Sequence, residues 1–281
     1  MGGEGQMQKV TIALKNGRHV TFDVDLGLEG PAFFVFGIRK SGSTLLNIIA
    51  AEMCRSNGRM FVNVGDKFFQ GNVLAVDWQT DPALHALLHP GNTYGGFRNM
   101  PLAMLKNPLF ESSPKVLIVR DPRDALVSEY FSDAYSHPIP SASSDSSDTA
   151  TLMERHRQRA LREGIDGYVL ERAQSMVRTI LEFRDVVNDP TTKVLKYEDY
   201  VFNKRELINV MAQHFSWSAH ENSIAAILNR VDIRPAKEDP QAFVRRVTPG
   251  DHREKLQPST IATLDVVLLG AMRLMGYSEG G

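Results

Sequence analysis

Apolar and polar residues alternate along residues 9–25, on both sides of Asn16-Gly17. Alternation with a period of two predicts two strands, one before and one after this dipeptide. Asn-Gly readily adopts the positive φ angles of a two-residue hairpin turn. The beginning of the chain is therefore predicted to form a small β-hairpin ahead of the main fold.

Short unbroken apolar runs follow, and such runs indicate strands that are buried on both faces, as in a parallel sheet. The predicted strands are 31–37, 60–64, 115–120 and 194–197. Helical spacing of apolar residues predicts helices at 45–53, at 82–89, from 123 onward, and at 152–163, 166–188, 204–215, 218–231 and 258–275. Strands that alternate with helices predict an α/β fold. We expect one domain over residues 1–281, with a mostly parallel central sheet flanked by helices, similar to P-loop nucleotide hydrolases.

Composition narrows the possible classes of protein. The 281 residues include 32 Lys and Arg against 33 Asp and Glu, a net charge of −1, so binding of nucleic acid through bulk charge is not expected. Cys54 is the single cysteine, which excludes a disulfide within the chain and favours a reducing, cytoplasmic location. The first ten residues have no apolar core like that of a signal peptide. No stretch approaches the ~20 apolar residues of a membrane span.

The first candidate site is the polar loop between the predicted strand 31–37 and the helix that follows it. It reads Arg39-Lys40-Ser41-Gly42-Ser43-Thr44. Amide groups at a helix start lack partners within the helix, and the helix dipole favours an anion there. The order Lys-Ser-Gly differs from the P-loop pattern, in which lysine follows glycine. This loop is either a phosphate-binding turn or an N-capped helix start with a solvated lysine.

The second candidate site follows the predicted strand 115–120. Arg120 lies at the carboxyl end of this strand, where ligands of open α/β sheets bind, and its guanidinium can bind a phosphate through two parallel hydrogen bonds. Ser128 lies about two helical turns further along and could contact the same anion. The alternative is a capped turn, Arg120-Asp121-Pro122-Arg123, with surface salt bridges.

Together the two loops resemble those of the sulfotransferase family that uses 3′-phosphoadenosine-5′-phosphosulfate (PAPS). Its members carry a Lys-Ser-Gly-[Ser/Thr]-Thr loop and, later, an Arg-[Asn/Asp]-Pro-[Lys/Arg]-Asp-x-x-x-Ser segment, which match residues 40–44 and 120–128 here. Residues 196–199 are similar to the family's Tyr-Glu-Asp segment, and residues 243–252 to its Arg-Lys-Gly…Gly-Asp-Trp segment. The resemblance covers roughly residues 31–276.

The resemblance implies that PAPS is the co-substrate and that a hydroxyl-bearing small molecule or carbohydrate accepts the sulfuryl group. The first loop would hold the 5′-phosphosulfate, the second loop the 3′-phosphate, and Tyr197 would lie near the adenine. No metal is required, because the leaving group is already a phosphate anion. The residues expected to bind PAPS are Arg39, Lys40, Ser41, Gly42, Ser43, Thr44, Arg120, Ser128, Tyr197, Arg245 and Arg246.

The catalytic residues are less well defined by the resemblance. Lys40 is expected to stabilise the oxygen that bridges sulfur to the leaving phosphate. Cytosolic members use a histidine as the base, but Asn99 stands at that position here and cannot accept a proton. We expect Asp66 to act as the base instead; it could equally be a turn residue paired with Lys67. His85 and His89 are less favoured candidates.

Two further roles and two other classes of protein remain open at this stage. Arg98 and Asn99 could bind the acceptor, and the Ser-rich loop 139–151 is either a lid over it or a mobile surface loop. A P-loop kinase or nucleotide hydrolase would need Mg²⁺ and a single anion site. A non-catalytic nucleotide-binding protein would explain the asparagine in place of the base. Oligomeric state cannot be derived from the sequence.

Overall fold

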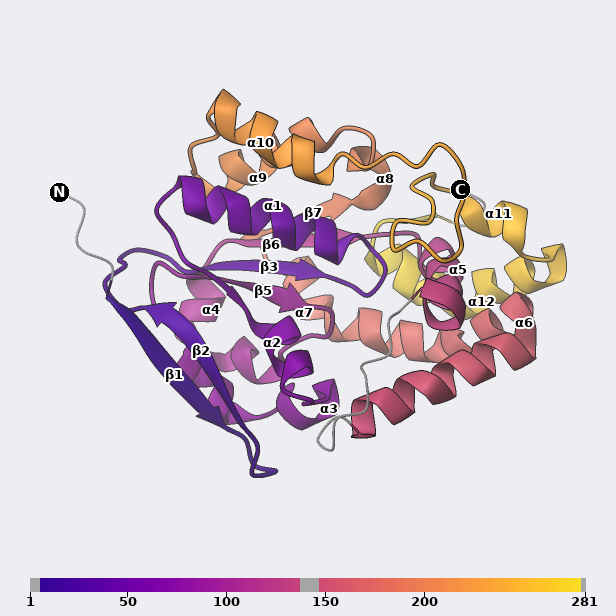
Figure 1. Ribbon diagram of the computed structural model, residues 1–281, viewed down its shortest axis with the longest axis horizontal. Helices are drawn as coiled ribbons and strands as arrows, with labels where there is room; N and C mark the ends of the chain where they lie inside the picture. Colours follow the sequence, from indigo (N-terminus) through magenta and orange to yellow (C-terminus); the bar gives the residue numbers. More distant parts are fainter. Residues whose placement is uncertain (1–5, 137–146, 279–281) are drawn as a thin grey trace.

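The computed structural model describes residues 6–136 and 147–278 (Figure 1). Its strands are β1 (Met7–Ala13), β2 (His19–Asp25), β3 (Phe33–Gly37), β4 (Phe61–Asn63), β5 (Thr93–Phe97), β6 (Lys115–Val119) and β7 (Thr192–Lys196). Its longer helices are α1 (Ser43–Ser56), α5 (Pro122–Phe131), α6 (Ser147–Glu182), α9 (Lys204–Phe215), α10 (Glu221–Val231) and α12 (Pro258–Leu274). Its short helices are α2 (Val64–Gln70), α3 (Ala75–Trp78), η1 (Pro82–Leu87), η2 (Leu102–Lys106), α4 (Pro108–Ser112), η3 (Ser132–Ser136), α7 (Arg184–Asn188), α8 (Tyr197–Tyr200) and α11 (Asp251–Lys255).

Five parallel strands form the central sheet in the order β4-β5-β3-β6-β7. Because all five run in the same direction, the loops that follow them emerge at one edge of the sheet. The loops after β3 and β6, which carry the two candidate sites, leave from adjacent strands. The predicted α/β fold with a parallel sheet is therefore confirmed.

Helices cover both faces of this sheet, and alternate residues of β3 point to the two cores. Phe33 and Val35 pack with residues of α1, α9 and α10, whereas Phe34 and Phe36 pack with residues of α5, α6 and α12. In Figure 1 the first group of helices lies above the sheet, and α6 and α12 lie on the other side of it. All five residues of β3 are buried, as the unbroken apolar run predicted.

The N-terminal hairpin is a separate two-stranded antiparallel sheet, as predicted, but its turn differs from the prediction. The amide of Gly17 donates to the carbonyl of Leu14 at 2.9 Å, and the amide of Leu14 donates to the carbonyl of Arg18 at 2.8 Å. Gly17 has a positive φ of 82°, whereas Asn16 does not. The connection is therefore a turn followed by one left-handed glycine, not a two-residue Asn-Gly turn.

Strand β5 is an element that the sequence analysis did not predict. Its sequence, TYGGF, contains two glycines, which have a low preference for strands. A Cβ on Gly95 would lie 2.5 Å from Cζ of Phe61, and a Cβ on Gly96 would lie 1.9 Å from Oδ1 of Asn63. The glycines are required because side chains of the neighbouring strand β4 pack directly over β5.

The predicted helices 152–163 and 166–188 belong to α6 and α7, and the break between them is a kink. Gly164, with φ 66° and ψ 177°, has a non-helical backbone inside α6. Part of the predicted Ser-rich loop, residues 139–146, lies outside the described residues. Its remaining residues, 147–151, are not a loop but the first turn of α6. Within the described residues, no helix combines the length and apolar character of a membrane span.

Candidate active site

The loop between β3 and α1 is a tight turn with two left-handed residues. Lys40 and Gly42 have φ angles of 65° and 93°. A Cβ on Gly42 would lie only 2.9 Å from Cδ2 of Tyr197, so the ring of Tyr197 packs against the bare backbone of Gly42. This contact brings residue 197, from the carboxyl end of β7, next to the loop that follows β3. Glycine is required here both by its conformation and by the close approach.

Ser41 stabilises the turn through hydrogen bonds to backbone carbonyls inside the protein. Its hydroxyl lies 2.5 Å from the carbonyl oxygen of Ile38 and 2.9 Å from that of Ile118 in β6, and its amide donates to the Ile38 carbonyl at 3.0 Å. The side chain is almost completely buried. Ser41 therefore shapes the loop, and the hydrogen of its hydroxyl is used within the protein.

Helix α1 begins at Ser43 without a side-chain cap and without an acidic residue in its first turn. The amides of Ser43, Thr44 and Leu45 therefore lack partners from the helix itself. The positive end of the dipole of this 14-residue helix lies at the same place. The loop and the first turn of α1 therefore present several hydrogen-bond donors, including the hydroxyls of Ser43 and Thr44, in an arrangement that suits an anion.

Lys40 lies in this turn and has an unusual electrostatic environment. Burial and the neighbouring Arg39 lower the pKa of the Lys40 amine to about 8, while the carboxylates of Glu129 and Asp133 oppose this shift. Arg120 also acts on it as a like charge. The amine has no hydrogen bond or ion pair with any residue that the structure describes. Its donors are therefore available to a bound anion.

Arg120 directly follows β6 and points back to the first loop. Its Nη1 lies 3.4 Å from the carbonyl oxygen of Lys40, and its guanidinium lies 4.7 Å from the centre of the Tyr197 ring. The side chain is only 6% exposed, and its buried Nε has no hydrogen-bond partner among the described residues. A buried N–H group without a partner is energetically costly, so this guanidinium is suited to an anionic ligand. The structure thus brings the two sequence motifs together at one edge of the sheet.

Two other residues of the predicted nucleotide site lie along the same edge. Ser128 is half-buried on α5, eight residues after Arg120, and its hydroxyl has no partner within the described ranges. Tyr197, at the start of α8, is buried between Gly42 and Arg120, and burial raises the pKa of its hydroxyl. Ser128 therefore keeps a free donor for an anion, whereas the Tyr197 ring already supports both loops.

Asp124, in the first turn of α5, connects this edge to the C-terminal part of the chain. Its carboxylate accepts hydrogen bonds from the amides of Gly250 and His252, at 2.7 and 3.0 Å, and from Nδ1 of His252 at 2.6 Å. Although burial alone would raise it, the bonds from His252 and the charge of Arg120 lower the pKa of Asp124 to about 2. His252 is thus a structural residue that anchors the segment 250–252.

Arg245 and Arg246 are occupied within the protein. Arg245 forms ion pairs with Glu238 and Asp251 and lies 4.1 Å from the centre of the Phe131 ring. Arg246 pairs with Glu254 at 2.5 and 2.7 Å and with Asp251 at 3.2 Å. The structure gives neither guanidinium a contact with the loop after β3 or with Arg120. In this arrangement both arginines stabilise the C-terminal segment.

Asp66 and Arg98 form an ion pair at the other end of the same edge. Asp66 lies in the first turn of α2, after β4, and its Oδ2 accepts a hydrogen bond from Nδ2 of Asn63 at 2.8 Å. Its other oxygen pairs with Nη1 of Arg98, which follows β5. The Asp66 side chain is 30% exposed. Asn99 is half-buried next to Arg98 and has no side-chain hydrogen bond among the described residues.

The other histidine candidates for a base lie elsewhere. His85, in η1, has its Nε2 2.7 Å from the carbonyl oxygen of Ala103. His89 precedes the amino end of β5, at the edge of the sheet opposite to the two loops. Asp66 is therefore the better placed of the predicted bases.

Arg39 shows an arrangement that the sequence analysis missed. Its Nε lies 3.1 Å from Glu129, and its Nη2 lies 3.1 Å from Asp133. Both carboxylates are buried and belong to α5 and the turn after it. The sequence contains one signal for this arrangement. Glu129 and Asp133 follow the Arg120 motif with a spacing of four residues, which places them on one helix face. The Arg39 guanidinium is thus held by the protein itself.

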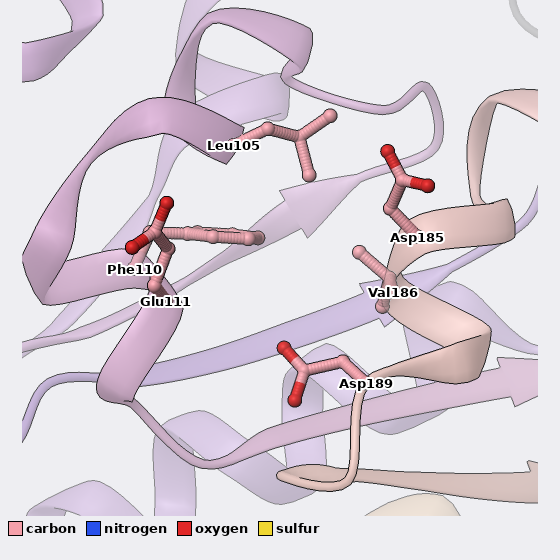
Figure 2. Close-up of a pocket in the computed structure, with 6 residues that line it drawn as sticks. All are labelled: Leu105, Phe110, Glu111, Asp185, Val186 and Asp189. Carbon is pink, nitrogen blue, oxygen red and sulfur yellow. The ribbon is translucent and has the colours of Figure 1, made fainter.

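A pocket of about 210 Å³ lies away from these residues (Figure 2). It is lined by Leu105, Phe110, Glu111, Asp185, Val186 and Asp189. These residues precede β6 and β7, so the pocket is at the opposite edge of the sheet. Asp189 is paired with the buried Lys115 at 2.8 Å. Within the described parts of the chain, no cluster of His, Cys, Asp and Glu is arranged to hold a metal ion.

Comparison with known proteins identifies the family. The model of the sulfotransferase domain matches residues 31–276, which is most of the chain. The chain therefore belongs to the sulfotransferase family and is a transferase. No match was found among curated protein sequences.

A solved structure supports this fold. The crystal structure of mouse sulfotransferase SULT7A1 complexed with PAP is 15% identical, with a TM-score of 0.56 over 90% of this chain and 92% of that chain. Retinol dehydratase in a complex with retinol and PAP is 14% identical, with a TM-score of 0.48 over 94% and 90% of the two chains. The sulfotransferase domain of the Synechococcus PCC 7002 olefin synthase is 15% identical, with a TM-score of 0.44 over 90% and 96%.

Proposed function

We propose that this sulfotransferase moves a sulfuryl group from PAPS to a hydroxyl of a small-molecule or carbohydrate acceptor and releases 3′,5′-adenosine bisphosphate (PAP). One observation carries the proposal: the buried guanidinium of Arg120, with its unused Nε, lies beside the uncapped start of α1 and Lys40. PAPS carries negative charge at both ends of its adenosine, so it needs two anion sites. A ligand with a single phosphate would use either Arg120 or the donors at the start of α1, and would leave the other set without a partner.

The free donors suggest how the nucleotide is held. The amides and hydroxyls of Ser43 and Thr44 would bind the 5′-phosphosulfate, where the dipole of α1 adds to the attraction. Arg120 and Ser128 would bind the 3′-phosphate. Arg39 and Ser41 would hold the first loop from within the protein, because their polar groups have internal partners. Arg245 and Arg246 would hold the C-terminal segment through their ion pairs.

In the proposed reaction, the acceptor oxygen forms a bond to sulfur while the bond from sulfur to the bridging oxygen breaks. The electron pair of that bond goes to the 5′-phosphate, and the proton of the acceptor hydroxyl goes to a base. Lys40 would donate a charge-assisted hydrogen bond to the bridging oxygen, where negative charge develops. Asp66 would take the proton, with Asn63 and Arg98 holding its carboxylate in place. Asn99 and Arg98 would contact the acceptor.

The first test measures nucleotide preference. Calorimetry should show that the wild-type protein binds PAP more tightly than 5′-AMP by about 30-fold, because a hydrogen-bonded charge pair contributes about 2 kcal/mol. Arg120→Ala should remove this preference and leave 5′-AMP binding nearly unchanged. Arg205→Ala is a matched control, since Arg205 forms an exposed pair with Glu221 and should not affect either affinity. An undiminished preference for PAP in Arg120→Ala would contradict the assignment.

The second test measures turnover. Transfer of ³⁵S from labelled PAPS to a panel of alcohols, phenols and sugars should proceed in EDTA, because no step of the proposal uses a metal. Turnover of ATP that EDTA abolishes would instead favour a P-loop kinase or hydrolase. Binding of PAP without transfer to any member of a broad panel would favour a non-catalytic nucleotide-binding protein. We further propose a cytoplasmic location, which the single cysteine supports.

A further inference from the structure

Two buried carboxylates lie next to the loop that carries Lys40. Glu129 lies in the last turn of α5, and Asp133 lies four residues later in η3, so both face the same direction. Their side chains are only 2% and 6% exposed. Burying two carboxylates side by side is costly unless cations and hydrogen-bond donors compensate them. Their partners therefore indicate what the pair does.

The partners come from two parts of the chain. Arg39, from the loop after β3, contacts both carboxylates at 3.1 Å. On α6, Nη2 of Arg172 lies 2.9 Å from Glu129, and the hydroxyl of Tyr168 donates to Asp133 at 2.6 Å. The pair thus links the first loop of the site to helix α6.

Two weaker interactions complete the surroundings of Asp133. Nδ1 of His156 lies 3.8 Å from its carboxylate, and Nε of Arg157 lies 3.5 Å from its carbonyl oxygen. Burial lowers the pKa of His156, while Asp133 opposes this shift. Burial raises the pKa of Tyr168, and Glu129 and Asp133 raise it further. The cluster therefore combines two carboxylates with several cations and one phenol.

Arg39 immediately precedes Lys40, whose left-handed backbone is unusual for a residue with a side chain. A conformation of this kind costs roughly 1–3 kcal/mol and persists only where the surroundings fix it. The two-point contact of Arg39 with Glu129 and Asp133 fixes the chain directly before Lys40 on one side. The hydroxyl of Ser41 fixes it directly after Lys40 on the other.

We propose that Glu129 and Asp133 are positioning residues for Lys40. Through their ion pairs with Arg39 they hold the turn in which Lys40 lies. Their negative charges also offset the positive charges around the Lys40 amine. The charged groups that act on this amine are Arg39 of the same loop, Arg120 directly after β6, Glu129 of α5 and Asp133 of η3. The inference rests on the proposed function in one respect, namely that the protonated amine of Lys40 acts in sulfuryl transfer.

The electrostatic part of the proposal predicts shifts of opposite sign. Glu129→Gln removes a negative charge that favours the protonated amine, so the pKa of Lys40 should fall. Arg39→Gln removes a positive charge that disfavours it, so the pKa of Lys40 should rise. Each shift should be about one pH unit, as expected for a partly buried charge at a few ångströms. A loss of packing alone would not produce opposite shifts.

A titration that does not need activity tests this. Lysines are methylated with ¹³C-formaldehyde, and the Lys40 signal is assigned as the one missing from Lys40→Arg. Its midpoint should move down in Glu129→Gln, move up in Arg39→Gln, and stay in place in Glu129→Asp, which keeps the charge. Asp189→Asn breaks a buried pair with Lys115 at the opposite edge of the sheet and should leave the midpoint unchanged. Asp133→Asn, with a downward shift expected, replaces Glu129→Gln should that variant fail to fold.

Kinetics then separate this inference from the proposed function. For wild type, kcat/KM for PAPS should decline as the pH rises through the Lys40 midpoint, and this decline should begin at lower pH in Glu129→Gln. The same Lys40 midpoint in wild type, Glu129→Gln, Asp133→Asn and Arg39→Gln would overturn the inference even in an active enzyme. A wild-type protein without PAPS turnover would overturn the proposed function, while the methyl titration would still decide the role of the two carboxylates.

Discussion

At the scale of single residues, the candidate site is defined by polar groups that lack internal partners. Lys40, the Nε of Arg120 and the hydroxyl of Ser128 have none among the described residues, whereas Arg39 and Ser41 are fully engaged. The sequence does not distinguish the role of Lys40 from that of Arg39, because the two residues are neighbours in one polar loop. Arg39 is distinguished only by contacts with residues about ninety positions later in the chain.

The first prediction concerns Lys40. Lys40→Ala should reduce kcat by about 10²–10³-fold, the usual loss when a single donor to a developing negative charge is removed. Its affinity for PAPS should change only a few-fold, because the bridging oxygen gains its negative charge only as the bond to sulfur breaks. Steady-state kinetics and calorimetry measure the two quantities. Lys67→Ala, an exposed lysine on α2, is the control, and equal losses in kcat and PAPS affinity would refute the catalytic role.

The second prediction concerns the base. Asp66→Asn should lower kcat by about 10²–10⁴-fold, as expected for the loss of a general base, and should leave PAP binding unchanged. Asp77→Asn is a suitable control, because Asp77 only accepts a hydrogen bond from the amide of Leu74 at the start of α3. Retention of kcat in Asp66→Asn would show that another group takes the proton.

At the scale of elements, the structure depends on glycines at positions where a neighbouring side chain packs directly against the backbone. The predicted strands β3 and β6 and helices α1, α9 and α12 were recognised because apolar residues recur in them at strand or helix spacing. Strand β5 was missed because Gly95 and Gly96 are poor strand formers. They are there because the side chains of Phe61 and Asn63 leave no room for a Cβ. The sequence alone does not reveal which neighbours a strand will have.

The third prediction compares two glycines. Gly42→Ala introduces a Cβ at a φ of 93° and against the Tyr197 ring, so it should lower the free energy of unfolding by roughly 1–3 kcal/mol and weaken PAP binding. Gly270→Ala, in an exposed position of α12 with open space around it, should raise that free energy by about 0.5–1 kcal/mol. Urea unfolding of both variants is the measurement, and similar changes in both would contradict this account of Gly42.

At the scale of the whole molecule, contacts between distant segments assemble the site. Asp124 on α5 receives three hydrogen bonds from residues 250–252, and Glu198 on α8 accepts hydrogen bonds from the amide of Asp121 and the hydroxyl of Tyr277. These bonds connect the Arg120 loop to the C-terminal part of the chain. The position of Arg120 therefore depends on the complete fold.

The fourth prediction concerns stability at low pH. The pKa of Asp124 is about 2 in the folded protein, against an ordinary value of 3.8 that applies to the unfolded chain. The ionised carboxylate therefore stabilises the fold by roughly 2 kcal/mol above about pH 4. This contribution is lost as the pH falls from about 4 to 2. Asp124→Asn should therefore be less stable than wild type at pH 7, with a smaller difference at pH 3.

Urea unfolding at both pH values measures this difference. Asp199→Asn, an exposed aspartate on α8, should match the wild type at pH 7. A difference between Asp124→Asn and wild type that stays constant from pH 7 to pH 3 would show that the Asp124 carboxylate does not contribute through its charge.

The sequence by itself determined the class of fold, the order of its main elements and the position of the two candidate-site motifs. Apolar periodicity, helix starts and turn residues act within a few positions of each other, so the chain displays them directly. Only the tertiary structure decided that the two motifs share one sheet edge, that Asp66 is paired with Arg98, and that Glu129 and Asp133 hold Arg39. Such pairings depend on strand order and on helices that return to the sheet from far along the chain. No local pattern of residues encodes those distances.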